Sequence, residues 1–234
     1  MTEKTFILSL ENISKSFGER KLFENLSMEL EAGKIYSLMG ANGSGKTTLF
    51  NILTGFLKAD SGKIHFNKIE INSKSPAEIN KLGIARSFQD LRLINGLSVK
   101  DNMLMVMEKK MFHIATCEEY KNVEKILEKV SLRNYTEHMG CDLSYGQQKL
   151  LTLGCCLANE PKLLLLDEPV AGIDNDNRGK IIDIVLKLKN EGITILQIEH
   201  DLEYIEASSD LVYQLDENGL KAMNMSESLN SFVK

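Results

Sequence analysis

The residues best suited to hold a phosphate chain are grouped in one glycine-rich stretch, residues 40–48. Its glycines allow successive backbone N–H groups to converge on phosphate oxygens, and a helix that begins there adds unpaired donors and partial positive charge. A lysine in such a loop reaches the β- and γ-phosphates, and a threonine hydroxyl binds the Mg²⁺ that bridges them. The spacing therefore predicts a nucleotide site, with the candidate residues Gly40, Asn42, Gly43, Ser44, Gly45, Lys46, Thr47 and Thr48.

The chain on either side of this loop has the patterns that such a site requires. Residues 34–39 are typical of a strand, and residues 46–53 are typical of the first turns of a helix. The alternative is a glycine-rich turn that only joins a strand to a helix. The strand and helix on its two sides favour the phosphate site over that alternative.

Two adjacent carboxylates, Asp167 and Glu168, directly follow the apolar run of residues 163–166. An acid that ends a strand of a parallel sheet lies at the carboxyl edge of that sheet, beside the phosphate loop. Asp167 is therefore a candidate to hold Mg²⁺ directly or through water, and Glu168 to orient and deprotonate an attacking water. The alternative is a pair of capping acids before Pro169.

A second helix start suited to an anion is predicted at residues 143–148, Leu-Ser-Tyr-Gly-Gln-Gln. Ser144 is a good N-cap, and Gly146 leaves room for a phosphate near the helix N-terminus. An apolar run at residues 150–158 continues this helix. One chain thus carries two half-sites that face phosphate.

The composition is that of an ordinary soluble globular protein: of 234 residues, 43% are hydrophobic and 26% are charged. Apolar runs stay far below the roughly 18 residues of a membrane-spanning helix, and the N-terminus has no secretory signal, so we expect a cytoplasmic protein. A net charge of −5 without a long basic run makes nucleic acid a poor candidate partner. The four cysteines have no Cys-x-x-Cys spacing and are interpreted as reduced and structural.

Hydrophobic periodicity divides the chain into an N-terminal region of strands, a helical middle and a C-terminal region where strands and helices alternate. We therefore predict an α/β fold with a mixed sheet, in which residues 1–234 form one domain and residues of about 90–142 form an inserted helical subdomain. The predicted strands are residues 6–10, 26–30, 63–66, 84–88, 163–166, 193–198 and 211–215, and the clearest helical patterns are residues 122–130 and 178–189.

The order of these motifs resembles the nucleotide-binding subunits of ABC transporters, over essentially the whole chain. The resemblance implies a P-loop NTPase (RecA-like) core with an N-terminal antiparallel β subdomain, ATP and Mg²⁺ as ligands, and ATP hydrolysis. It implies that residues 40–47 are the Walker A loop, that Asp167 is the Walker B aspartate and that Glu168 is the catalytic glutamate. It implies that Phe17 stacks on adenine, and that Gln89 is the Q-loop glutamine, which is catalytic and also binds Mg²⁺. The signature residues Ser144, Gly146 and Gln147 would contact ATP across a dimer. Asp174 would be the D-loop aspartate and His200 the switch histidine.

Subunits of that family join head to tail, so that the signature of one closes over the ATP held by the Walker motifs of the other. The resemblance therefore implies a homodimer or heterodimer that works with transmembrane permease subunits and is peripheral on the cytoplasmic face of the membrane. ATP binding closes the dimer, and hydrolysis, for which Glu168 polarises water and His200 steadies the γ-phosphate, lets it reopen.

Three segments look like the ATP-binding subunits of branched-chain amino-acid and urea importers, namely residues 82–89, 167–172 and 199–201. They indicate an importer of amino acids or related small solutes. Because other subunits choose the substrate, a subunit of an exporter or lipid transporter and a soluble non-transport ABC ATPase stay open as alternatives. A GTPase is disfavoured, because residues 67–70, Asn-Lys-Ile-Glu, end in glutamate where guanine recognition needs aspartate.

The chain departs from the usual pattern of the family at four positions. Tyr145 stands where the signature commonly has a second glycine, and its ring is expected to point away from the phosphate. Leu150 and Cys155 replace arginines found in many relatives, and Asn175 replaces a proline that often follows the D-loop. These changes bear on hydrolysis rate and dimer stability rather than on nucleotide binding.

A stripe of apolar residues in the helical middle allows two interpretations. Core packing is the commoner role of such a stripe, but flexible methionines could also line a groove for a helix of a membrane subunit. The residues concerned are Leu91, Leu93, Ile94, Leu97, Met103, Met105, Met107 and Met111.

Overall fold

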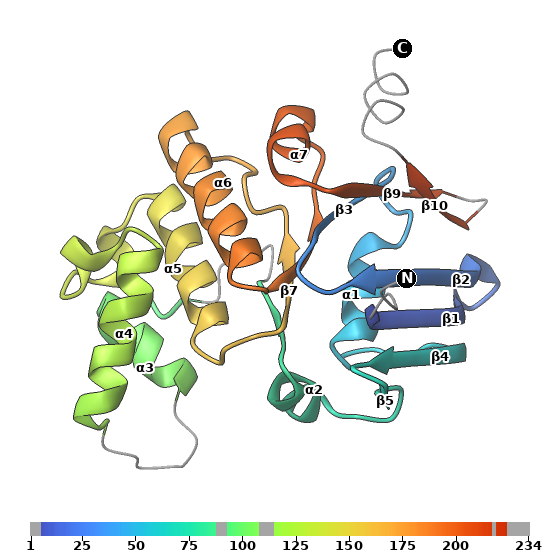
Figure 1. Cartoon of the computed structure of the whole chain (residues 1–234), viewed down its shortest axis with the longest axis horizontal. Helices are drawn as coiled ribbons and strands as arrows, with labels where there is room; N and C mark the ends of the chain where they lie inside the picture. The colour runs from blue at the N-terminus through green and yellow to red at the C-terminus, as the bar shows by residue number, and fades with distance from the viewer. Residues whose placement is uncertain (1–5, 88–92, 108–114, 217–218, 224–234) are drawn as a thin grey trace.

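The computed structural model describes residues 6–87, 93–107, 115–216 and 219–223, and it contains two β-sheets with helices between and beside them (Figure 1). The first sheet is antiparallel, with the strand order β2-β1-β4-β5. Its strands are β1 (Phe6–Phe17), β2 (Arg20–Glu31), β4 (Ser61–Phe66) and β5 (Ile69–Glu70).

The second sheet is mixed, with the strand order β10-β9-β3-β8-β7-β6. Neighbouring strands from β9 to β6 run parallel, whereas β10 forms an antiparallel hairpin with β9. The carboxyl ends of the parallel strands meet at one edge, which is where open α/β sheets bind ligands. The strands are β3 (Ile35–Met39), β6 (Ile84–Arg86), β7 (Leu163–Asp167), β8 (Thr194–Ile198), β9 (Leu211–Asp216) and β10 (Gly219–Met223).

Helices join the parallel strands, and a group of them forms the side of the molecule away from the antiparallel sheet (Figure 1). Long crossovers of this kind are what parallel strands need. The helices are α1 (Lys46–Leu53), α2 (Pro76–Leu82), α3 (Val99–Met107), α4 (Cys117–Lys129), α5 (Tyr145–Leu157), α6 (Asn175–Asn190) and α7 (Leu202–Ser208), with short 3₁₀ turns at Arg133–Tyr135 and Gly140–Asp142.

The mixed sheet is covered on both faces, and β7 shows how the sequence produces this. Leu163 and Leu165 pack in a core shared with α1 and the antiparallel sheet, whereas Leu164 and Leu166 pack in a second core with α5 and α6. Successive side chains of a strand point to opposite faces, so a parallel strand covered twice is apolar throughout. This buried strand fixes the position of Asp167, its last residue.

The predicted fold class is confirmed: an α/β mixed sheet stands beside an N-terminal antiparallel sheet, with a helical region. β1 and β2 are longer than the predicted strands at 6–10 and 26–30. Bulges beside Asn12 and Asn25, which both have positive φ, shift the register and interrupt the alternation of side chains. β6 ends at Arg86, two residues before the predicted end, while Leu91 and Met111 lie outside the described residues.

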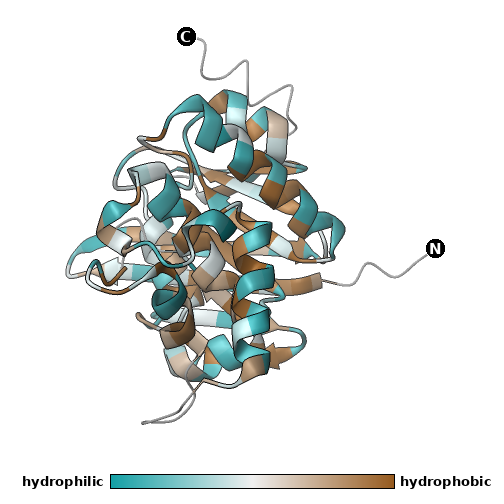
Figure 2. Ribbon diagram, turned by 90° about the vertical axis from the view of Figure 1, so that its left-hand side faces the viewer, coloured by the Kyte–Doolittle hydropathy of each residue, from teal (hydrophilic) through white to brown (hydrophobic). Residues whose placement is uncertain are grey.

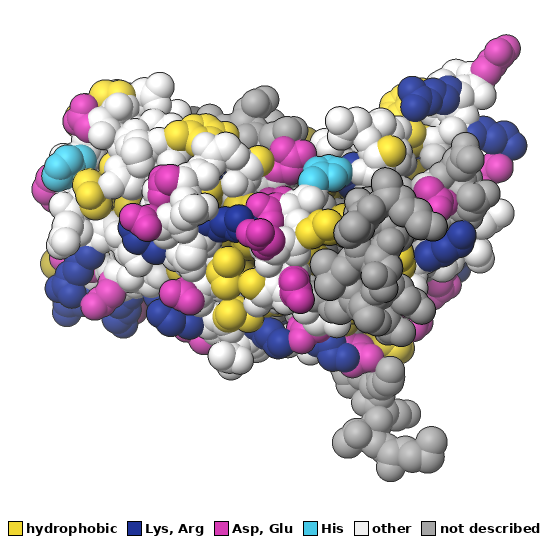
Figure 3. All heavy atoms as spheres, turned by 90° about the horizontal axis from the view of Figure 1, so that it is seen from above, with side chains coloured by type: hydrophobic (Ala, Val, Ile, Leu, Met, Phe, Trp, Pro, Cys, Tyr) yellow, Lys and Arg dark blue, Asp and Glu magenta, His cyan; other side chains and the backbone are white. Residues whose placement is uncertain are grey.

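Polar and charged side chains are found over much of the surface that the figures show. Figure 2 looks onto the helical side, where hydrophilic residues cover much of the outward faces of the helices. The view from above in Figure 3 shows Lys and Arg side chains interspersed with Asp and Glu. Within the described ranges, no helix has the length and apolar character needed to cross a membrane.

Candidate functional site

The glycine-rich loop between β3 and α1 is shaped to receive an anion. Gly45 is the N-cap of α1 with a φ of +105°, and no side chain caps this helix. The Lys46 ammonium folds back over the loop and donates to the backbone oxygens of Gly40, at 2.7 Å, and Ala41, at 3.0 Å. The Ser44 hydroxyl is buried and has no hydrogen-bond partner among the described residues. An uncapped helix start, an ammonium and a spare hydroxyl therefore converge here.

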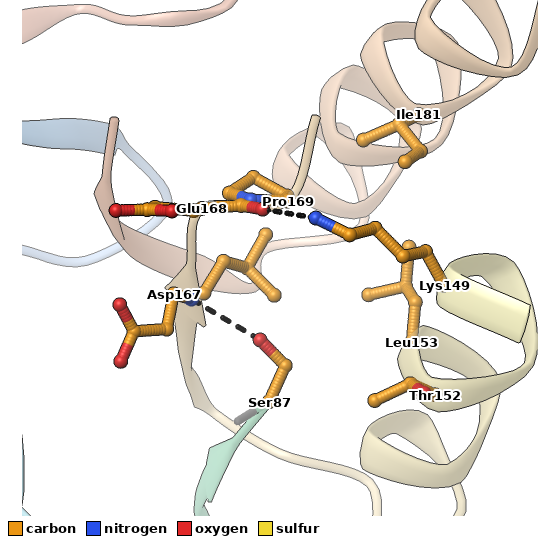
Figure 4. Close-up of a pocket in the computed structure, with 9 residues that line it drawn as sticks. Ser87, Lys149, Thr152, Leu153, Asp167, Glu168, Pro169 and Ile181 are labelled. Carbon is orange, nitrogen blue, oxygen red and sulfur yellow. Dashed lines mark hydrogen bonds between the residues drawn. The ribbon is translucent and has the colours of Figure 1, made fainter. Parts of the chain in front are cut away.

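The negative charges of the two predicted carboxylates affect the pKa of the lysine in this loop. Burial lowers the pKa of the Lys46 ammonium, while the negative charges of Glu168 and Asp167 oppose that shift. Figure 4 shows the side chains of Asp167 and Glu168 pointing to the same side of the end of β7. The structure thus brings together the loop and the acid pair, as predicted for the carboxyl edge of the sheet.

The backbone at Glu168 is strained and is held by hydrogen bonds on both sides. Its φ is +50°, in the left-handed region, which costs an L-residue roughly 1–2 kcal/mol. The Glu168 N–H donates to the Ile198 oxygen at 3.0 Å. The Glu168 carbonyl accepts from the Ala171 N–H at 3.3 Å and from the Lys149 ammonium at 2.5 Å. These contacts offset the strain and aim the carboxylate.

Arg86, at the end of β6, joins three elements beneath the acid pair. Its Nη2 lies 2.9 Å from Oδ2 of Asp167, and its Nη1 donates to Oδ1 of Asn51 on α1 at 2.6 Å. The side chains of Arg86 and Asp167 are both buried. The Asp167 N–H in turn donates to the Ser87 hydroxyl at 3.2 Å (Figure 4). Asp167 is therefore fixed through its backbone and its side chain.

Glu199 is a buried carboxylate that ties the turn after β7 to the turn after β8. One of its oxygens accepts from the Val170 N–H at 3.1 Å, and the other accepts from the N–H groups of His200, at 2.8 Å, and Asp201, at 3.2 Å. His200 itself is exposed at the carboxyl end of β8. The predicted switch histidine thus lies on a turn whose backbone is fixed by its neighbour in the sequence.

The predicted signature residues form the capped start of α5. Ser144 is the N-cap: its hydroxyl accepts from the Gln147 N–H, and the Gln147 side chain accepts from the Ser144 N–H, so the two form a capping box. The phosphate contact of Gly146 stays a prediction, and the structure gives a second reason for a glycine at this position. A Cβ there would lie 2.4 Å from the Asn177 amide nitrogen, so Gly146 serves the packing of α5 on α6.

Asp174 is the N-cap of α6 and is exposed. Its carboxylate accepts from the Asn177 backbone N–H at 2.9 Å and from the Asn177 side-chain amide at 2.6 Å. These hydrogen bonds hold the pKa of Asp174 below its usual value, because they favour the charged form. Since Asn177 also packs on Gly146, one asparagine connects the predicted D-loop to the predicted signature.

Phe17 ends β1 with its ring exposed on the β1–β2 hairpin, which lies against the phosphate loop. Leu22 packs beside Gly45, and the Arg20 guanidinium is 3.3 Å from the Gly43 oxygen. An exposed ring next to a phosphate loop is available to stack on a base. Gln89, the predicted Q-loop residue, lies outside the described residues.

The oxygen donors at this edge fit Mg²⁺ bound together with a nucleotide. Mg²⁺ is usually held by one or two carboxylates and substrate phosphates rather than by a complete protein cage. Thr47 is exposed in the first turn of α1, and Asp167 supplies the carboxylate. In the part of the chain that the structure describes, no cluster of three or more His, Cys, Asp or Glu could hold a metal alone. This donor set therefore suits a metal that brings its phosphates with it.

Three contacts of this site were missed by the sequence-based prediction: Arg86 with Asp167, Lys149 with Glu168, and Glu199 with Val170. A charged residue inside the apolar run at 84–88 was the available signal for Arg86. A lysine directly before the apolar run of α5 was the signal for Lys149.

Comparisons with known proteins agree with this geometry. The family model described as ABC transporter matches residues 23–171. A probable branched-chain amino acid transport ATP-binding protein, LivG of Methanocaldococcus jannaschii, is 37% identical over 224 residues, which cover 91% of this chain and 87% of the relative.

Two solved structures resemble the chain over nearly its whole length. A nucleotide-free ATP-binding cassette from an ABC transporter has a TM-score of 0.89 at 34% identity and covers 98% of this chain and 96% of its own. A dimeric bacterial ABC transporter cassette has a TM-score of 0.82 at 26% identity and covers 93% of this chain and 98% of its own.

The mixed sheet, the phosphate loop and the acids at the carboxyl edge define a P-loop ATPase. Within that class the chain belongs to the ABC transporter family. It is an ATP-binding and ATP-hydrolysing cassette.

Proposed function

We propose that this chain powers the import of amino acids, as the ATP-hydrolysing subunit on the cytoplasmic face of a membrane transporter. The convergence of Lys46 with Asp167 and Glu168 at one sheet edge carries the ATPase part of the proposal. Its likeness over most of its length to a branched-chain amino acid transport protein supports the substrate class.

Each residue of the site has a distinct task in the proposed hydrolysis. Lys46 and the N–H groups at the start of α1 bind the phosphates, and Phe17 stacks on the adenine. Thr47 and Asp167, together with Gln89, would hold Mg²⁺, which neutralises phosphate charge when bound. Glu168 orients the attacking water and accepts its proton, and His200 donates to the γ-phosphate.

The proposed active form is a head-to-tail dimer, with either a second copy or a related subunit. Ser144 and Gln147 lie at an exposed helix start, and the Ser144 hydroxyl already caps that helix. In the dimer this start faces the nucleotide bound by the other subunit, and Asp174 lines the same seam. A dimeric cassette among the structural neighbours supports this arrangement.

A groove beside the helical region is the proposed docking place for a permease subunit. It has a volume of about 340 Å³ and is bordered by Ile94, Met105 and Val106, which are 40–49% exposed. Met103 of the same stripe is buried, so the stripe serves both the core and the groove. Arg86 lines this groove and also pairs with Asp167, so a permease bound in the groove would lie one side chain away from the proposed ATP site.

Two experiments test the proposal. The purified chain should release phosphate from Mg-ATP, and chelation of Mg²⁺ should abolish that release. Co-expression with the permease subunits of a branched-chain amino acid transporter should yield ATP-dependent uptake of labelled amino acids into membrane vesicles. ATP-dependent efflux of the same solutes would favour an exporter, and ATPase activity without any co-purifying permease would favour a soluble ABC ATPase.

Docking has its own test. Ile94→Glu should prevent co-purification with the permease subunits while leaving phosphate release by the isolated chain unchanged. Tyr120→Glu is the matched control, because Tyr120 is also an exposed hydrophobic residue but lies on α4, outside the groove. Equal co-purification of both variants would place the docking surface elsewhere.

A further inference from the structure

We propose that Lys149 is a positioning residue, which couples the signature helix α5 to the peptide that carries the catalytic carboxylate of Glu168 in its own subunit. The proposal rests on the proposed function, because it concerns how the signature at the start of α5 affects the position of Glu168 during ATP hydrolysis.

The contact is direct. The Lys149 ammonium donates to the Glu168 carbonyl at 2.5 Å, and its side chain crosses from α5 to the turn after β7 (Figure 4). Lys149 is only 9% exposed. The carbonyl it holds belongs to the left-handed residue whose conformation aims the Glu168 side chain. A shift of this ammonium therefore moves the strained peptide at Glu168.

The surroundings of Lys149 favour this specific contact over general charge compensation. Glu199, Glu168 and Asp167 all contribute negative charge at the ammonium, yet the hydrogen bond found for it goes to a backbone oxygen. A small cavity of about 20 Å³, lined in part by Ser87 and Ile181, lies beside this link. The link therefore borders a cavity with room for about one water molecule.

Tyr145, which stands where the family's signature commonly has a glycine, also contacts Lys149. The Lys149 ammonium lies 5.5 Å from the centroid of the Tyr145 ring, one helical turn earlier, in a cation–π contact. The ring is half-exposed and also lies beside Gly172, in the segment that follows β7. Tyr145 and Lys149 thus extend from the capped helix start at Ser144 to Glu168.

The consequence is a connection between two ATP sites. In the proposed dimer, Ser144 contacts the nucleotide of the other subunit, whereas Lys149 on the same helix holds Glu168 of its own site. Closure of α5 on one nucleotide therefore sets the carboxylate that acts on the second. The α5 residues between them are held by packing on both sides: Gly146 packs against Asn177 of α6, and Leu150, next to Lys149, is buried in the core.

The first test separates positioning from binding. Lys149→Met keeps the apolar stem and removes the ammonium. We expect kcat for ATP to fall by roughly 10- to 100-fold, with KM and the Kd for ATP changed by less than about threefold. Lys149→Arg should recover most of the rate, because it restores a donor. Lys129→Met, which removes a half-exposed lysine paired with Glu191, is the matched control and should behave as wild type.

The second test asks whether Lys149 acts through Glu168. In a Glu168→Gln background, adding Lys149→Met should lower the residual rate by less than about twofold, because the carboxylate that Lys149 positions is already absent. Urea unfolding of each variant shows whether the fold is retained. If Lys149→Met does not fold, Lys149→Gln, which removes the charge and shortens the reach, takes its place in both tests.

The outcomes are distinct. A wild-type rate in Lys149→Met, or equal rate losses with and without Glu168, would overturn the inference and leave the proposed ATPase intact. A parallel loss of ATP affinity would assign Lys149 to binding instead. Absence of ATP hydrolysis by the wild-type chain would overturn the proposed function and this inference together.

Discussion

Arg86 and Asp167 form a buried ion pair, with Arg86 Nη2 at 2.9 Å from Asp167 Oδ2 and side chains that are 4% and 2% exposed. The pair joins the strand that leads toward the predicted Q-loop to the strand that carries the predicted metal ligand. The Arg86 guanidinium thus neutralises the Asp167 carboxylate within the chain. A Mg²⁺ ion held by Asp167 would therefore share this carboxylate with Arg86.

Removing Arg86 should be costly for the fold. Arg86→Met leaves the Asp167 charge buried without its partner, and breaking a buried pair in this way lowers the free energy of unfolding by about 3–5 kcal/mol. The double variant Arg86→Met with Asp167→Asn should lose distinctly less than the sum of the two single losses, because no unpaired charge remains. Urea unfolding of the four proteins measures this, and additive losses would show that the pair does not contribute as a unit.

Glu168 should govern hydrolysis but not binding. Glu168→Gln keeps the size and polarity of the side chain and removes the base, so we expect hydrolysis to fall by roughly a hundredfold or more. Affinity for ATP should be retained, and ATP should hold the variant as a dimer, which light scattering can measure. Glu128→Gln, which changes an exposed acid on α4, is the control and should hydrolyse ATP at the wild-type rate. Near-normal turnover in Glu168→Gln would remove Glu168 from its proposed role.

The elements that the sequence predicted well are those with uninterrupted patterns. β7 and α1 were predicted within one residue of their observed bounds, because a fully buried strand and a phosphate loop have strong local signals. The full length of β1 was not predicted, since the bulge at Asn12 resets the alternation. α2 was missed, although Ser75, Pro76 and Glu78 form the capping box and first turn of a short helix.

In the site, the sequence predicted the residues that lie close together along the chain, but it did not predict the contacts between residues far apart in the sequence. Arg86 and Asp167 are separated by 81 positions, and Lys149 and Glu168 by 19. A motif reports which residue types are present, but the partner of a buried charge depends on which strands become neighbours. The role of Gly146 shows the same limit, because Asn177 on another helix decides what fills the space beside it.

Asp174 should make stability depend on pH in the acid range. Hydrogen bonds from Asn177 lower its pKa in the folded chain, below the ordinary value of 3.8 expected in the unfolded chain. The stabilisation is therefore complete above about pH 5 and is lost as the pH falls below about 4 toward the folded-state pKa. Asp174→Asn keeps a good N-cap without titrating. Thermal unfolding should show a higher Tm for the wild type than for this variant at pH 7, and a difference that shrinks as the pH falls below about 4. A constant difference would contradict the assignment.

Two serines allow the capping and dimer roles of Ser144 to be separated. Ser144 caps α5 through Gln147, and Ser75 caps α2 through Glu78, each in a reciprocal capping box. Ser144→Ala and Ser75→Ala should therefore each lower the free energy of unfolding by about 1 kcal/mol. Only Ser144→Ala should also weaken the ATP-dependent dimer, because only Ser144 faces the nucleotide of the other subunit in the proposed arrangement. Light scattering at several ATP concentrations, in a Glu168→Gln background that prevents hydrolysis, measures the difference. An equal effect of both variants on the dimer would mean that Ser144 acts through stability alone.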